Sequence, residues 1–73
     1  MLKVDLTKTD TQICRLIAEK CKPFGAITSV NLYRSPSPYA VVRMETRKEA
    51  SALSRKLGKS TFDGAVIIPL ERK

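Results

Sequence analysis

The fold of this chain is decided by one stretch of sequence, FGAITSVNLYR, which covers residues 24–34. Phe24 and Gly25 end a helical pattern, and an alternation of apolar and polar residues follows at once. A glycine directly after an apolar periodic residue is typical of a helix C-terminus, and the alternation is typical of a strand. The stretch therefore predicts a helix that leads directly into a β-strand, with the apolar side chains of both facing one core.

Before this stretch, residues 2–6 alternate between apolar and polar and predict a half-buried first strand. Thr9 and Gln12 fit a capping box, in which Thr9 is the N-cap and the Gln12 side chain reaches back. Pro23 and Gly25 predict the end of the helix that this box begins. Its inward-facing residues recur at helical spacing: Ile13, Leu16, Ile17, Cys21 and Phe24.

After this stretch, residues 35–38 read Ser-Pro-Ser-Pro and predict a loop, because two prolines do not fit the interior of a sheet. A third strand is predicted over residues 39–44. Thr46 and Glu49 form a second capping-box pattern, followed by a helix that turns Ala50, Leu53 and Leu57 inward.

The chain ends with a turn over residues 62–64 and a predicted last strand over residues 65–70. Pro69 lies inside that strand and favours a place at the edge of the sheet, where a missing N–H has no effect. The whole order is βαββαβ. It predicts one α+β domain over residues 1–73, with two helices on one face of a four-stranded antiparallel sheet in the ferredoxin-like plan. The other face of the sheet is left uncovered, and we expect the function there.

Charge and composition narrow the class of partner. The net charge is +7 on 73 residues, which favours polyanionic partners that release counterions when their phosphates are neutralised. No apolar run approaches the length of a membrane span, and we expect an intracellular, cytoplasmic protein without a membrane partner, or a nuclear one if it is eukaryotic. Cys14 and Cys21 are seven residues apart on one helical face, too far for a disulfide within that helix, and are expected to be reduced.

The order and spacing of these segments resemble the RNA recognition motif family over about residues 2–70. The stretch FGxIxxVxL beginning at Phe24 is similar to the family's junction of first helix and second strand. The stretch TFDGxxI beginning at Thr61 is similar to the family's turn into the last strand. The resemblance implies binding of single-stranded nucleic acid by exposed aromatic residues of two strand motifs. The segment 37–44 matches the longer motif only at Tyr39, Ala40 and Val42, and Lys3 replaces an aromatic residue of the shorter one.

Period-two alternation selects the side chains on the uncovered face. Asp5 belongs to this set, and the candidate nucleic-acid-binding residues are Lys3, Asn31, Tyr33, Tyr39, Val41 and Arg43. The tyrosines are expected to stack one or two bases, and the cations to hold phosphates. The expected activity is weak, salt-sensitive binding of single-stranded RNA, with single-stranded DNA as the other nucleic-acid ligand.

Two alternatives stay open. In the first alternative, the chain is a protein-interaction or homodimerisation module that kept the fold, with Val41 and the end of the last strand (Ile68 or Leu70) as its apolar surface. Alternatively, the nucleic acid contacts the basic outer side of the second helix, where Arg55 and Lys56 lie. An enzyme is not expected, because the chain has no histidine and no paired carboxylates. No pattern indicates a cofactor, a small-molecule substrate or a metal site.

Overall fold

The computed structural model describes residues 2–58, 60–62 and 64–72, of which the side chains of Ser60 and Phe62 are left out. The elements follow in chain order as β1 (Leu2–Val4), α1 (Asp10–Cys21), the 3₁₀ turn η1 (Lys22–Phe24), β2 (Ile27–Tyr33), β3 (Tyr39–Met44), α2 (Arg47–Lys56), β4 (Ser60–Phe62) and β5 (Ala65–Arg72). The predicted βαββαβ order is confirmed, and the short strand β4 is an addition that the sequence did not indicate.

The first helix begins and ends as its sequence predicts. The Oγ1 atom of Thr9 accepts from the Gln12 N–H (3.2 Å), and the Gln12 side chain accepts from the Thr9 N–H (3.1 Å), which completes the capping box. At the other end the chain tightens into η1, and Gly25 follows with φ +143°. A residue other than glycine is strained in that conformation, so Gly25 is what allows the chain to turn into β2.

The start of α2 is tied to this same junction by Glu49. One carboxylate oxygen of Glu49 accepts from the Thr46 hydroxyl (2.8 Å), and the other accepts from the Ala26 N–H (2.8 Å). A Cβ atom at Gly25 would collide with the Glu49 carboxylate. The two helices are therefore linked at the point where α1 passes into β2, and glycine is needed there for space as well as for its φ.

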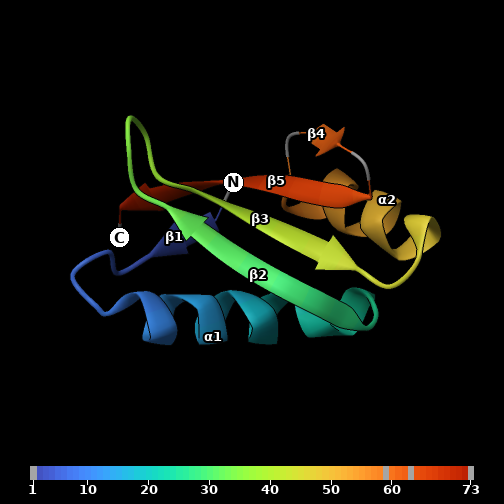
Figure 1. Ribbon diagram of the computed structural model, residues 1–73, viewed down its shortest axis with the longest axis horizontal. Helices are drawn as coiled ribbons and strands as arrows, with labels where there is room; N and C mark the ends of the chain where they lie inside the picture. Colours follow the sequence, from blue (N-terminus) through green and yellow to red (C-terminus); the bar gives the residue numbers. More distant parts are fainter. Residues whose placement is uncertain (1, 59, 63, 73) are drawn as a thin grey trace.

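The sheet differs from the antiparallel one that the sequence predicts. Its strands lie in the order β1-β5-β3-β2, with β4 paired to β5. Strands β2, β3 and β5 pair antiparallel, but β1 pairs parallel to β5, with Leu2 opposite Leu70 and Val4 opposite Arg72. The sheet is therefore mixed, and β1 lies at its edge beyond β5. Figure 1 shows β5, β3 and β2 side by side in this sheet.

The prediction that Pro69 marks an edge strand is wrong, because β5 lies between β1 and β3. The Leu70 N–H donates to the Pro38 carbonyl (3.0 Å). Hydrogen-bonded and non-hydrogen-bonded pairs alternate along an antiparallel ladder, so Tyr39 and Pro69 form a non-hydrogen-bonded pair. The Pro69 nitrogen therefore points to the other edge of β5. At that edge, pairing with β4 ends at Ile67 and pairing with β1 begins at Leu70. Pro69 lies between the two paired segments, so its missing N–H costs the sheet no hydrogen bond.

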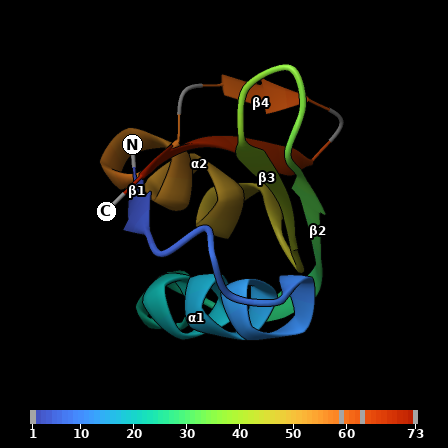
Figure 2. The ribbon, with the colours of Figure 1, turned by 90° about the vertical axis from the view of Figure 1, so that its left-hand side faces the viewer.

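Both helices lie on one side of the curved sheet, which confirms the ferredoxin-like α+β arrangement in its layers (Figure 2). The core between them is apolar, with Ile13, Ile17, Val42 and Leu53 fully buried. Leu16, Phe24 and Leu57, also predicted to face inward, are only partly buried against this core.

The expected apolar patch at the end of the last strand is not formed by Ile68 and Leu70, which belong to the core. In a strand with alternating sides, their burial leaves Ile67 and Pro69 on the side away from the helices. The predicted turn over residues 62–64 contains Asp63, which lies outside the described residues; Gly64 has φ +79°.

Candidate nucleic-acid interface

The open face, meaning the side of the sheet away from the helices, is organised in rows by the register of β2, β3 and β5. The first row consists of Tyr33, Tyr39 and Pro69, the second of Asn31, Val41 and Ile67, and the third of Ser29, Arg43 and Ala65. Five of the six candidate residues predicted from the sequence thus lie on one continuous surface: Asn31, Tyr33, Tyr39, Val41 and Arg43.

The tyrosine pair, Tyr33 and Tyr39, is the most distinctive feature of this surface. The two residues face each other across β2 and β3, and their ring centroids lie 5.0 Å apart with an interplanar angle of 15°. This is an offset-stacked geometry, which contributes about 0.5–1.5 kcal/mol beyond the burial of area. One face of each ring is therefore occupied by the other ring.

The two rings differ in what lies on their other sides. Tyr39 has Pro69 as its partner on β5 and is half-buried. Tyr33 lies on β2, the last strand of the sheet, and 45% of its surface is exposed. The outer face of Tyr33 is therefore the aromatic surface that an additional ring can stack on.

Polar and apolar groups continue the surface beyond the tyrosine pair. The Asn31 amide is exposed and carries both donors and an acceptor, while Val41 and Ile67 beside it are half-buried and apolar. Arg43 is exposed in the third row, where the Thr28 hydroxyl donates to its carbonyl (3.0 Å). This hydrogen bond lies at the register shift between Ile27 and Ser29, and such bulges re-aim side chains at sheet edges.

The structure separates Lys3 from the other candidates. Lys3 is exposed on β1, opposite Glu71 of β5, so two strand spacings, about 10 Å, lie between its backbone and β3. Asp5 follows the end of β1, and its carboxylate accepts from the N–H (3.0 Å) and the hydroxyl (2.6 Å) of Thr7. The first-strand motif is therefore not adjacent to the tyrosine pair.

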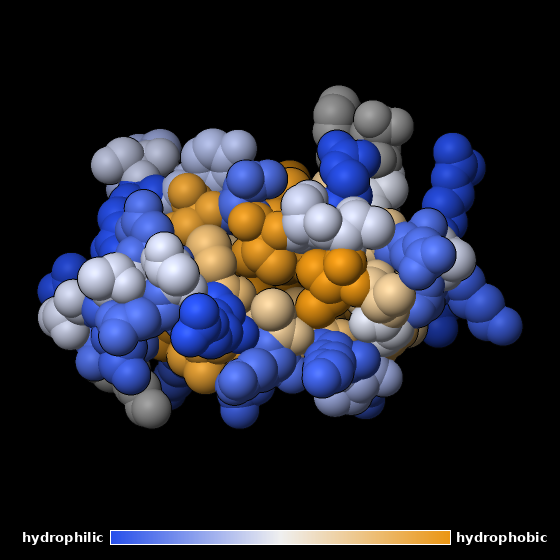
Figure 3. Space-filling view, turned by 60° about the horizontal axis from the view of Figure 1, so that its bottom comes forward, coloured by the Kyte–Doolittle hydropathy of each residue, from blue (hydrophilic) through white to orange (hydrophobic). Residues whose placement is uncertain are grey.

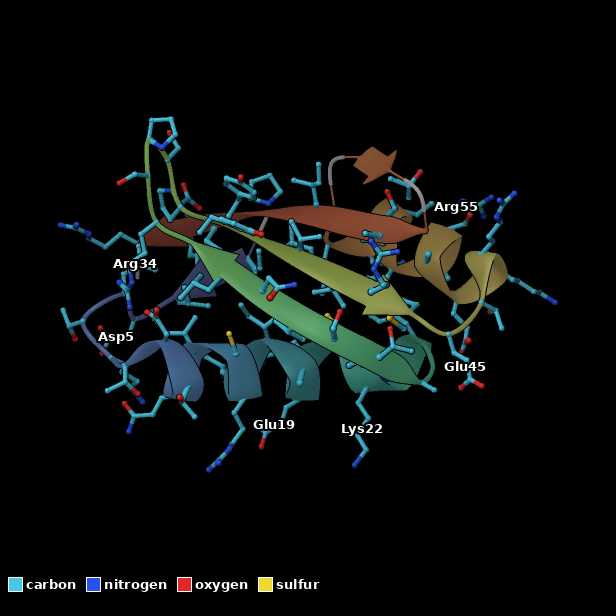
Figure 4. All side chains as sticks on the ribbon, in the orientation of Figure 1. Asp5, Glu19, Lys22, Arg34, Glu45 and Arg55 are labelled. Carbon is cyan, nitrogen blue, oxygen red and sulfur yellow. The ribbon has the colours of Figure 1, made fainter. Side chains whose placement is uncertain are left out.

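Arg34, which directly follows Tyr33, has a positioning role that sequence reasoning missed. Its Nε donates to Asp10 Oδ1 (2.9 Å), and its two Nη atoms donate to the carbonyls of Leu6 (2.8 Å) and Lys8 (2.9 Å). Nη2 also forms an ion pair with Asp10 at 2.8 Å. Figure 4 shows Arg34 directed toward the loop that leads into α1. The end of β2 that carries Tyr33 is therefore fastened to the loop between β1 and α1.

The cysteines are free thiols. Cys21 is fully buried, and burial raises the pKa of its thiol to about 11. Cys14 is half-buried, and its pKa is raised mainly by burial and to a lesser extent by the negative charge of Asp10. Within residues 2–58, 60–62 and 64–72, no group of three His, Cys, Asp or Glu side chains is placed to hold a metal ion. In the same residues, neither helix is long and apolar enough to span a bilayer.

Comparison with models of known families identifies the family of this chain. The model of the RNA recognition motif family matches residues 15–68, about three quarters of the chain. The match begins within α1 and ends within β5, so it includes both tyrosines and leaves out β1. Searches of curated proteins and of solved structures gave no significant match.

Proposed function

Because this chain belongs to the RNA recognition motif family, we propose that it binds single-stranded RNA through the open face of its sheet, without catalysis. Nucleic-acid binding is the general property of the family. The observation that carries the proposal for this chain is the tyrosine pair, stacked on the side of the sheet opposite α1 and α2 (Figure 2) and exposed at Tyr33.

The residues of the open face have distinct roles in this proposal. One base stacks on the outer face of Tyr33, extending the row of rings that Tyr39 continues. The Asn31 amide reaches the edge of that base or of its neighbour. Arg43, in the third row, interacts with the phosphate backbone or stacks on a base through its guanidinium plane. Lys3 contributes only long-range charge, because β5 lies between it and the tyrosine pair.

This surface predicts modest affinity. One exposed aromatic face supports one base at about 1–3 kcal/mol, where a full platform stacks two or three bases. The net charge of +7 adds a contribution that falls as salt is raised. The binding is therefore expected to be salt-sensitive and tolerant of sequence, with RNA preferred over DNA only where the 2′-hydroxyl is contacted.

An amide-shift titration with a short single-stranded oligouridylate at low salt tests the proposal. We expect the largest shifts at Asn31, Tyr33 and Tyr39, and none on the side of α1 that faces away from the sheet. Figure 4 shows Glu19 of α1 and Lys22 of η1 projecting away from the sheet, and their amides provide the internal control. Shifts confined to the helices, or no shifts at all, would refute binding at the open face.

A second function is favoured by apolar side chains that the fold leaves partly exposed. Ile27, Val30 and Leu32 of the edge strand β2 face the helices but are only half-buried, and Figure 3 shows apolar side chains in a strip between hydrophilic borders. Such a strip is suited to a protein partner or to a second copy of the chain. Sedimentation showing a dimer, together with no amide shift on addition of RNA at low salt, would favour this function over the first.

A further inference from the structure

A hollow lies at the far end of the sheet from the tyrosine pair, between α2 and the hairpin of β4 and β5. Its volume is about 250 Å³, and the residues that line it are Arg47, Ala50, Ser51, Thr61 and Gly64. None of them belongs to the open face, and nothing in the proposed function uses them. We call this hollow the Arg47 pocket.

The lining of the Arg47 pocket has the chemistry of an anion site. Arg47 brings a guanidinium group, whose planar donors match the oxygens of a phosphate. Ser51 lies one turn further along α2 on the same side, and its hydroxyl and that of Thr61 are donors from opposite walls. No acidic side chain is among the lining residues that the structure gives.

The acidic residues nearest in sequence to Arg47 are turned elsewhere. Glu49 is bound to the Thr46 hydroxyl and the Ala26 N–H, at the α1–β2 junction. Figure 4 shows Glu45 projecting away from the side of the molecule on which β4 lies. At Gly64 an added Cβ atom would meet nothing within 4 Å, so the backbone there borders open space. Among the lining residues that the structure describes, Arg47 thus brings the charge, and the pocket is open to a ligand at Gly64.

The Arg47 pocket lies in line with the rows of the open face. Gly64 directly precedes Ala65, whose partner on β3 is Arg43, and Arg47 follows the end of β3 by three residues. Figure 1 shows the end of β3, the start of α2 and the start of β5 at the same end of the molecule. Arg43 is four residues from Tyr39 along β3, about 14 Å. A strand of several nucleotides would cover this length.

We propose that the Arg47 pocket binds a backbone phosphate of the same RNA strand whose base stacks on Tyr33. The proposal rests on the proposed function and extends it: bound RNA runs along the rows from the tyrosine pair past Arg43, and its backbone is held beside α2. The phosphate contact at Arg47 is specific, in contrast to the diffuse attraction of RNA to the other positive charges of α2.

The test compares Arg47→Gln with Lys56→Gln. Both changes remove one exposed cation from α2, but Lys56 lies nine residues further on, half a turn around the helix from Arg47. With an octauridylate as the probe, Arg47→Gln is expected to weaken binding about two- to fivefold at low salt. It should also reduce the slope of log affinity against log salt by about 0.7, the value for one phosphate of a single strand. Lys56→Gln should leave both close to those of the unaltered protein.

Two further measurements sharpen the test. A diuridylate is too short to reach from Tyr33 to the Arg47 pocket, so Arg47→Gln should not affect its binding. Ser51→Ala removes a hydroxyl donor and no charge, so it should weaken octauridylate binding without changing the salt slope. Thermal unfolding of each variant checks that the fold is retained.

The outcomes distinguish this proposal from the one on which it rests. Equal effects of Arg47→Gln and Lys56→Gln would overturn the phosphate pocket and indicate diffuse attraction to α2. An effect of Tyr33→Ala with no effect of Arg47→Gln would overturn the pocket and leave binding at the open face in place. If the unaltered protein binds neither oligonucleotide at low salt, both proposals are wrong.

Discussion

Replacing Tyr33 by alanine is the most direct perturbation of the proposed RNA surface. Tyr33 has one ring face against Tyr39, and 45% of its surface is exposed at the sheet edge. Loss of the ring removes a base-stacking surface, which costs about 1–3 kcal/mol of binding free energy. That range corresponds to a dissociation constant about 5- to 150-fold higher at 25 °C. It also removes the ring pair, with a loss of about 0.5–1.5 kcal/mol in the free energy of unfolding.

Fluorescence anisotropy with a labelled oligouridylate measures the affinity, and urea unfolding measures the stability. Tyr33→Phe is the matched control, because it keeps the ring and removes only the hydroxyl; it should retain nearly the original affinity. The salt slope should be the same in all three proteins, since no charge changes. Unchanged affinity in a folded Tyr33→Ala variant would refute stacking at this residue. An equal loss in Tyr33→Phe would assign the effect to the hydroxyl.

Other features of the structure give three further predictions. Gly25→Ala should destabilise the fold by about 1–3 kcal/mol more than Gly64→Ala, because both residues have positive φ but only Gly25 faces the Glu49 carboxylate. Urea unfolding measures this difference in the free energy of unfolding, and equal losses in the two variants would contradict the prediction. Hydrogen bonds from the Thr46 hydroxyl and the Ala26 N–H lower the pKa of Glu49 from its ordinary value of 4.5. The ionised carboxylate therefore stabilises the fold above the pKa of the unfolded chain, and this stabilisation is lost as the pH falls through the lower pKa of the folded protein. Glu49→Gln should therefore reduce the fall in melting temperature between neutral and acidic pH, and an unchanged fall would contradict this linkage. A maleimide at neutral pH should modify Cys14 well before Cys21, because burial raises the pKa of the Cys21 thiol to about 11 and covers it; mass mapping that finds Cys21 modified first would contradict this.

The local elements could be predicted from the sequence because their signals are local. Thr9 and Gln12 form the capping box that their spacing indicates, and β3 has the bounds predicted for it. The outward direction of Tyr33 and Tyr39 follows from alternation alone. Their stacking depends on the register between two strands, which no single segment determines.

The arrangement of the last strand could not be predicted, because its sequence has no alternation. The run AVIIPL from Ala65 is apolar at nearly every position, so its two faces are indistinguishable before the sheet is assembled. Long-range pairing decides which strands flank β5. Pro69 is compatible with this interior strand only because the partner on one edge changes from β4 to β1 at Pro69. For the same reason Ile67 and Pro69 were missed as residues of the open face. Arg34 was missed because its partners are distant in sequence.

The inward-facing pairs beneath the tyrosines have a consequence for how the surface would bind. Leu32 pairs with Ala40 and Val30 with Val42, and both residues on the β3 side are fully buried. A slip by one residue would expose them, so the core holds the register that stacks the two rings. The ring pair is thus preorganised without a ligand, and a base that binds there loses its own freedom but does not have to order the protein. Selectivity would then come from the shape of a rigid surface, with little adaptation of the protein to each RNA.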